Sequence, residues 1–233
     1  MFVSRRLATV AALVAMTGFC LALLAARIVV SGKFLHSFMA WNLLLAWIPF
    51  LCALWLYDRY RRDGSWLLIF VLGLAWLAFL PNAPYIVTDL IHLEATPGPI
   101  PLWFDAVFFV TAAWTGLLLG LVSLYLVQSV VRVAIGLVTS WLFVGFSFVL
   151  CAFGIYLGRF QRFNSWEIVS NPRSIAHFIL DRAAHPVMHP RAIAVTVLFT
   201  GLLAASYLVF YAFVDPKIGA QGLVETRGRD DRG

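Results

Sequence analysis

The sequence predicts an all-α fold, a polytopic transmembrane bundle of about six spanning helices with one amphipathic helix along the outer interface. Of its 233 residues, 62% are hydrophobic and 12% are charged, and the mean hydropathy is +0.91. A soluble domain carries about a quarter charged residues, so this chain could not cover a water-facing surface. Apolar runs of the length that a bilayer requires, about 20 residues, recur along it. These observations make the lipid bilayer its main partner.

Six apolar runs follow one another along residues 1–214, which we interpret as a single transmembrane domain. The first run is uncharged for 20 residues, from Leu7 to Ala26. It is longer than the core of a signal peptide, which has about 7–15 residues, so we interpret it as a retained helix. The last five expected spans contain no Asp, Glu, Lys or Arg. The six spans are Leu7–Val30, Met39–Tyr57, Trp66–Val87, Ala106–Val131, Val133–Gly158 and Ala192–Val214.

Basic residues in the short connections predict the orientation. Arg5 and Arg6, the segment 58–63, Arg132 and the basic tail all fall on one side if the number of spans is even. Short loops rich in Arg and Lys stay in the cytoplasm. We therefore expect a multi-pass plasma-membrane protein with both termini cytoplasmic and a polar, disordered tail. The tail comprises residues 215–233, and the outer loops comprise residues 31–38, 88–105 and 159–191.

The net charge of +6 does not indicate nucleic-acid binding, because the basic residues are dispersed along the rims of the bundle. The three cysteines lie inside apolar runs, without metal-ligand or disulfide spacing. His185 and His189 have the spacing of a metal pair, but each precedes a proline that disfavours helical geometry. We expect neither a metal nor another cofactor.

The most informative stretch is 80–94, where Pro81 and Pro84 interrupt an apolar run. The helix before them is about 22 Å long at 1.5 Å per residue, which is shorter than the hydrocarbon core of a bilayer. Backbone carbonyls freed at this depth must find partners within the protein or in water, and Asn82 and Tyr85 are candidates. Two interpretations remain open: a kinked helix end, or a broken helix that lines a polar cavity as in transporters.

Polar residues that are unusual for a membrane protein gather at the predicted outer face. Asp89 and His92 are three residues apart and share a helix face, whereas Glu94 could join them only through a bend. Asp105 opens the fourth span, where a capping role is favoured. The candidate cluster comprises Asn82, Tyr85, Asp89, His92, Glu94, Asp105, Arg159, Arg162, Asn164 and Glu167.

Two further patterns concern packing. Gly116 with Gly120, and Gly154 with Gly158, are separated by three residues, which allows helices to approach closely. Residues 172–184 have one apolar face and suit a helix that lies along the outer interface.

Several motifs resemble those of a bacterial membrane family, domain-of-unknown-function family 1361. They are Phe79–Tyr85 with Thr88–Leu93, Trp41–Leu43 with Trp47–Pro49, Trp103–Asp105, and Gly158–Phe160 with Asn164–Trp166. The resemblance spans about residues 36–185, and Glu167 stands where Asp is expected. It implies a polytopic membrane protein and brings no established activity.

Three functions fit these residues. The first is a structural or scaffolding role, in which outer acids and arginines pair with each other. The second is binding or transport of a small solute such as an anion held by Arg159 and Arg162, for which a homodimer would enclose the path. The third is an envelope-facing enzyme that uses Asp89, His92 and either Asp105 or Glu94 as acid–base groups or metal ligands. The pattern favours the first function and leans against an enzyme.

Overall fold

The computed structural model describes residues 2–93, 99–161, 173, 177, 181–182 and 188–214. Within this part of the chain the secondary structure is entirely helical, and six helices are long and apolar enough to span a membrane. The predicted all-α membrane fold is therefore confirmed. The helices are α1 (Phe2–Ser31), α2 (Phe38–Arg61), α3 (Trp66–Phe79), α4 (Asn82–Tyr85), the 3₁₀ helix η1 (Ile86–His92), α5 (Leu102–Ile135), α6 (Leu137–Phe160) and α9 (Pro190–Phe213).

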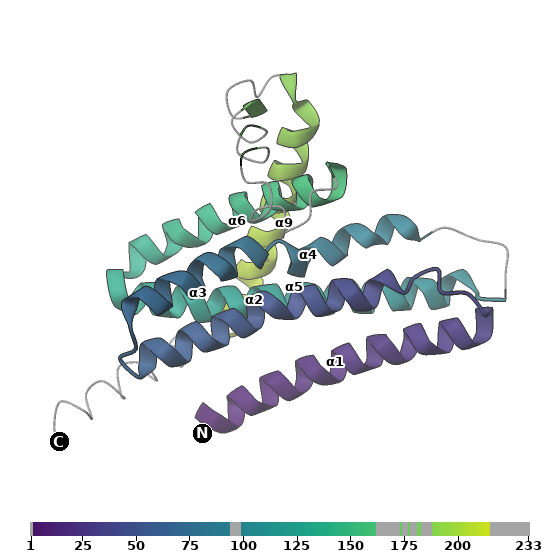
Figure 1. The fold of residues 1–233 in the computed structure, drawn as a ribbon, viewed down its shortest axis with the longest axis horizontal. Helices are drawn as coiled ribbons and strands as arrows, with labels where there is room; N and C mark the ends of the chain where they lie inside the picture. The colour runs from purple at the N-terminus through teal and green to yellow at the C-terminus, as the bar shows by residue number, and fades with distance from the viewer. Residues whose placement is uncertain are drawn as a thin grey trace.

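Helices α1, α2, α3, α5 and α6 run along the long axis of the molecule, and α9 crosses them steeply (Figure 1). We call the end of the bundle at which η1 ends the His92 end. The opposite end, where α5 is followed by α6, is the Gly136 end. Arg6 of α1 donates to Asp58 at the end of α2 over 2.6 Å. Arg132 donates to the hydroxyl of Tyr211 in α9 over 3.0 Å. The first turns of α1 and the last turn of α9 therefore both lie toward the Gly136 end.

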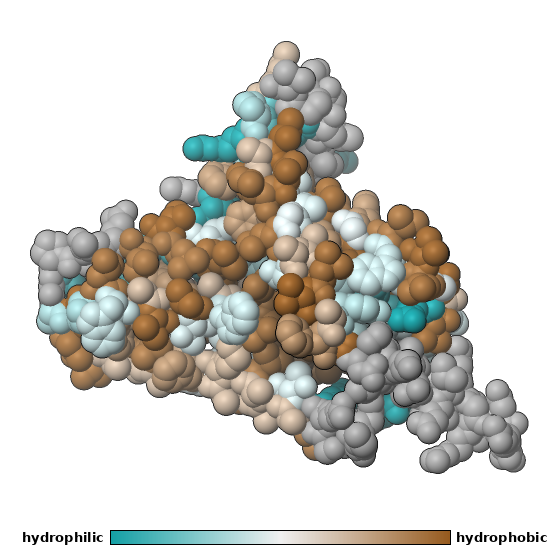
Figure 2. Space-filling view, turned by 180° about the vertical axis from the view of Figure 1, so that it is seen from behind, coloured by the Kyte–Doolittle hydropathy of each residue, from teal (hydrophilic) through white to brown (hydrophobic). Residues whose placement is uncertain are grey.

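Helix α5 is the centre of the bundle. In an apolar stretch of 18 residues of α5, 67% of the residues are buried, whereas the corresponding share is 39% or less in each of the other five candidate spans. It packs against α1, α2, α4, η1, α6 and α9. The outer helices expose apolar side chains instead, and Figure 2 shows them across much of the described surface. Such a surface suits lipid, which is as apolar as the side chains that face it.

The junction between α5 and α6 differs from the expected one. Arg132 does not form a loop but lies in the last turn of α5, and Gly136 alone separates the two helices. Gly136 has a φ of 102°, a conformation that glycine adopts without a steric penalty. The predicted boundary was wrong because the apolar residues after Arg132 continue the helix up to this glycine.

The last five expected spans contain no charged residue, but the helices that include them do. The helices extend beyond the apolar runs at both ends of the bundle, because backbone hydrogen bonding continues into polar turns that hydropathy alone places in loops. Parts of the predicted loop 88–105 are helical for the same reason, since 88–92 belong to η1 and 102–105 to α5. The charged residues inside helices include Asp58, Asp89, Asp105, Arg132 and Arg159.

The proline-broken span has the predicted break. Helix α3 ends at Phe79, and the chain continues as α4 and then η1. Asn82 donates to the carbonyl of Phe79 over 3.0 Å, as expected for a freed carbonyl, whereas the hydroxyl of Tyr85 contacts Arg159 instead. A cavity beneath the break holds about 20 Å³ and has an apolar lining that includes Leu80 and Pro84. The pocket that the structure describes at the break is thus lined by apolar side chains, as expected for a kinked helix end.

Glycines of α5 and α6 hold the break between these two helices. A Cβ atom on Gly116 would lie 2.4 Å from the carbonyl oxygen of Ala83, and one on Gly154 would lie 2.5 Å from Cγ of Pro81. A Cβ on Gly120 would lie 3.3 Å from Cβ of Ala83. The close approach expected of these glycines is confirmed, and the partner that they admit is the broken span.

Replacing Gly154 by alanine should therefore destabilise the protein. The added methyl group meets the rigid ring of Pro81, and overpacking of this kind costs about 1–3 kcal/mol. Gly145 of the same helix is the matched control, because nothing lies within 4 Å of its added Cβ. Gly145→Ala should be neutral or slightly stabilising. Thermal unfolding of both variants in the same detergent is the measurement, and equal midpoints would contradict the packing described.

Candidate functional site

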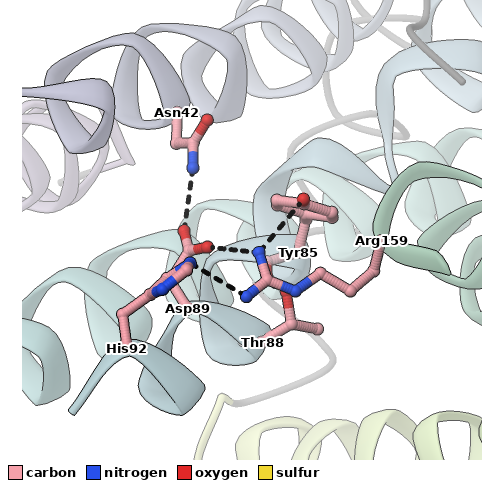
Figure 3. A network of polar contacts seen from close by, with 6 residues as sticks. All are labelled: Asn42, Tyr85, Thr88, Asp89, His92 and Arg159. Carbon is pink, nitrogen blue, oxygen red and sulfur yellow. Dashed lines mark hydrogen bonds and ion pairs between the residues drawn. The ribbon is translucent and has the colours of Figure 1, made fainter. Parts of the chain in front are cut away.

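Arg159, in the last turn of α6, is the centre of a polar cluster at the His92 end (Figure 3). Its Nη1 donates to Oδ1 of Asp89 over 3.1 Å and to the hydroxyl of Tyr85 over 3.4 Å. The second carboxylate oxygen of Asp89 accepts from Nδ2 of Asn42 over 2.8 Å. We call Asn42, Tyr85, Asp89, His92 and Arg159 the Arg159 network. It joins α2 and α6 to the end of the broken span.

His92 completes the network as an acceptor. Its Nε2 lies 3.0 Å from Nη2 of Arg159. A guanidinium group has only donors, so this contact is a hydrogen bond when Nε2 carries the lone pair, as in the neutral tautomer with its proton on Nδ1. The ring of Phe38 meets that of His92 edge-on, with centroids 5.3 Å apart. His92 is exposed, whereas Asp89 is only 1% exposed, so the network runs from the surface into the bundle.

The local sequence explains why these groups share one face. Pro81 and Pro84 end the α-helix, and the chain tightens into the 3₁₀ helix η1, in which residues three apart are eclipsed. Asp89 and His92 are so spaced and both point toward Arg159. Thr88 stabilises the turn by donating to the carbonyl of Tyr85 over 2.7 Å. The guanidinium also lies 5.8 Å from the centroid of the Tyr85 ring, within the range of a cation–π contact.

A second ion pair lies at the same end of the bundle. Nε and Nη2 of Arg27 in α1 donate to the two carboxylate oxygens of Asp105 over 2.7 and 3.1 Å. The two side chains are 4% and 8% exposed. The expected capping role of Asp105 is wrong, because the N-cap residue of α5 is Pro101 and no side chain caps the helix. Asp105 is instead the counter-ion of Arg27.

His36 lies between the two ion pairs. Its ring contacts those of Phe38 and Phe109, with centroids 5.9 and 5.1 Å away. Its Nδ1 is buried and has no hydrogen-bond partner among the described residues. Burial, and next the positive charge of Arg27, lower the pKa of His36 below its usual value. Both effects favour the neutral form of the ring.

The structure brings together four of the predicted site residues: Tyr85, Asp89, His92 and Arg159. Asn82 lies in the break and Asp105 in the second ion pair. The remaining candidates, Glu94, Arg162, Asn164 and Glu167, lie outside the described residues, as do the tail 215–233 and most of the expected interfacial helix 172–184.

The candidate cluster predicted from the sequence did not include Asn42 of the Arg159 network. It also did not include Arg27 and His36, which lie at the same end of the bundle. Arg27 carried a usable signal, because an arginine at the end of an apolar span requires a counter-ion within the protein. Asn42 occurs in one of the motifs that carry the family resemblance, and nothing in its local sequence marks its partner. His36 has no local signal, since its surroundings come from α1 and α5.

The carboxylates of Asp89 and Asp105 are both paired with other side chains of the protein. Asp89 accepts from Asn42 and Arg159, and Asp105 accepts twice from Arg27. Within the described ranges, no three His, Cys, Asp or Glu side chains lie close enough to hold a metal ion. For either carboxylate to act as a general base, its ion pair would first have to open.

Comparison with known proteins gives one match. The model of a family described as "Protein of unknown function (DUF1361)" matches residues 41–206, which is more than half of the chain. No curated protein and no solved structure matches. The matched region contains all five members of the Arg159 network, whereas Arg27 and His36 precede it.

Removing the charge of Asp105 should strongly destabilise the protein. Asp105→Asn leaves Arg27 buried without a counter-ion, and breaking a buried ion pair costs about 3–5 kcal/mol. The control is Asp58→Asn, which breaks the Arg6 pair with both side chains about a third exposed. Such exposed pairs contribute about 0–1 kcal/mol. Unfolding midpoints would show the contrast, and an equal loss in both variants would contradict it.

The lowered pKa of His36 predicts an acid-sensitive contribution to stability. The unfolded chain binds the proton more readily, so this contribution is complete above the unfolded pKa of about 6.5 and declines as the pH falls below it. His36→Phe removes the titrating group and suits the surrounding rings. Its unfolding midpoint should fall less than that of the wild type between about pH 7.5 and 5.5. Parallel pH profiles would show that His36 has no such effect.

Proposed function

The chain belongs to the DUF1361 family of proteins of unknown function, and from the geometry of its site we propose that it is a structural protein of the cell membrane. In this proposal, the Arg159 network is a clamp that fixes the end of the proline-broken span to α2 and α6. The role is non-enzymatic and depends on the fold of the clamp.

The observation that carries the proposal is the internal pairing of the network. Asp89 is 1% exposed, and each of its oxygens accepts a hydrogen bond from a different helix. Arg159 directs its donors to the same carboxylate, to Tyr85 and to His92. A site built to hold a charged ligand would keep such groups unpaired, because the ligand must supply the missing charge. Here the acid and the base neutralise each other.

The clamp has a clear physical task. Helix α3 ends before it can cross the hydrocarbon region, and the span is completed by two short helical pieces. The backbone hydrogen bonds of short pieces are less cooperative than those of one long helix. Side-chain bonds from α2 and α6 hold the last piece where its own helical bonding does not.

The orientation is part of the proposal. Arg59, Arg61 and Arg132 lie toward the Gly136 end of the bundle. Short connections rich in arginine stay in the cytoplasm, which supports cytoplasmic termini and an outward-facing network in a bacterial inner membrane.

A second candidate function is the binding or transport of a small anionic solute. One observation favours it: both ion pairs lie within helices that form candidate spans. Ionisable residues inside membrane spans often mark solute or ion paths. The Arg159 side chain is also 13% exposed, and the described residues offer no acceptor to its Nε. A homodimer would then enclose the path.

A double-mutant cycle tests the clamp. Asp89→Asn and Arg159→Gln should each lower the unfolding free energy by about 3–5 kcal/mol, as expected for a broken buried pair. The double variant should be no less stable than the worse single variant, because the lost interaction is shared. Asp89→Asn combined with Arg132→Gln is the control, since these sites lie at opposite ends of the bundle and their effects should add within about 0.5 kcal/mol.

The same variants separate the two functions. If single replacements leave the unfolding midpoint unchanged, the clamp is wrong. If phosphate, sulfate or a carboxylate raises the midpoint of the wild type but not that of Arg159→Gln, the solute-binding function is supported instead.

A further inference from the structure

The contact between His92 and Arg159 depends on the protonation state of the histidine. Its Nε2 accepts from the guanidinium at 3.0 Å, and this requires a neutral ring. Histidine is the side chain whose ordinary pKa of about 6.5 allows a change of charge near neutral pH. Since His92 is exposed, a proton reaches it without any opening of the bundle.

Protonation would reverse the contact. Both ring nitrogens would become donors, so Nε2 could no longer accept from Arg159, and two positive charges would stand 3.0 Å apart. Asp89, one turn of η1 away, is the nearest negative charge to both cations among the described residues. A protonated His92 would therefore compete with Arg159 for this carboxylate.

The surrounding charges do not cancel this effect. His92 contacts Arg159 of α6 and interacts electrostatically with Asp89 of η1, and Arg159 is bonded in turn to Asp89 and to Tyr85 of α4. Phe38 of α2 covers one edge of its ring. Beyond Phe38 lie His36, whose neutral form is favoured by its burial, and the pair of Arg27 with Asp105. Among the described residues, Asp89 is the acid shared by His92 and Arg159.

We propose that the Arg159 network is a proton-operated latch, in which protonation of His92 transfers Asp89 from Arg159 to His92 and releases η1 from α6. The proposal rests on the clamp described above and adds its regulation. The backbone of η1 lies against α5 and α2, and the Arg159 side chain ties η1 to α6. Loss of this tie would loosen η1 while the core around α5 stays folded.

Amide hydrogen exchange of the full chain in lipid nanodiscs tests the latch. The opening of residues 86–92 would be compared at about pH 7.5 and 5.5, after correction for the intrinsic pH dependence of exchange. In the wild type, the opening equilibrium should be larger at pH 5.5 than at pH 7.5. His92→Gln retains an acceptor oxygen but does not titrate, so its opening should be independent of pH. His92→Lys carries a fixed charge and should be open at both pH values.

Three results would overturn the latch. They are equal pH dependence in the wild type and His92→Gln, protection of η1 in His92→Lys, and loss of the pH effect in His36→Gln instead. The coupling between Asp89 and Arg159, measured at both pH values, separates this failure from that of the clamp. Coupling that is present and equal at both values would leave the clamp intact and refute the latch. Coupling that is absent at both would refute the clamp itself.

Discussion

Polar groups within a bilayer must be satisfied by the protein, and this constraint shapes the whole structure once Pro81 and Pro84 have broken the third span. The amide of Asn82 takes up a carbonyl at the break. Glycines on α5 and α6 remove the side chains that would keep the kink out of the bundle. The Arg159 network then fixes the segment that follows. Each feature answers a problem that the two prolines create.

The two ion pairs have complementary positions around α5. Arg27 with Asp105 ties α1 to the first turn of α5, while Arg159 with Asp89 ties α6 to η1, which packs on α5. Each pair is electrically neutral, so the layer adds no net charge to a low-dielectric region where an unpaired charge would be costly. The two ion pairs at the His92 end are thus balanced in charge.

The sequence predicted the features that depend on residues close together along the chain. Hydropathy and length predicted six spans, the proline pair predicted the break, and the glycine spacing predicted close approach. It failed where partners are distant, since Arg27 and Asp105 are 78 residues apart and Asp89 and Arg159 are 70 apart. The pairing of Asp89 was one of several open alternatives. Asp105 was assigned to a cap because a helix start can be recognised from neighbouring residues, whereas its partner Arg27 is 78 residues away. Helix ends were misplaced because charged turns continue the helices beyond the apolar runs.

The single-residue connection at Gly136 has a consequence for biogenesis. With one glycine between α5 and α6, there is no hydrophilic stretch that could remain on one side of the bilayer while a ribosome-bound chain pauses between two insertion events. The two helices must enter lipid together as a hairpin. Since α5 is the core of the bundle, the hairpin would be an early template on which the kinked span and the flanking helices assemble.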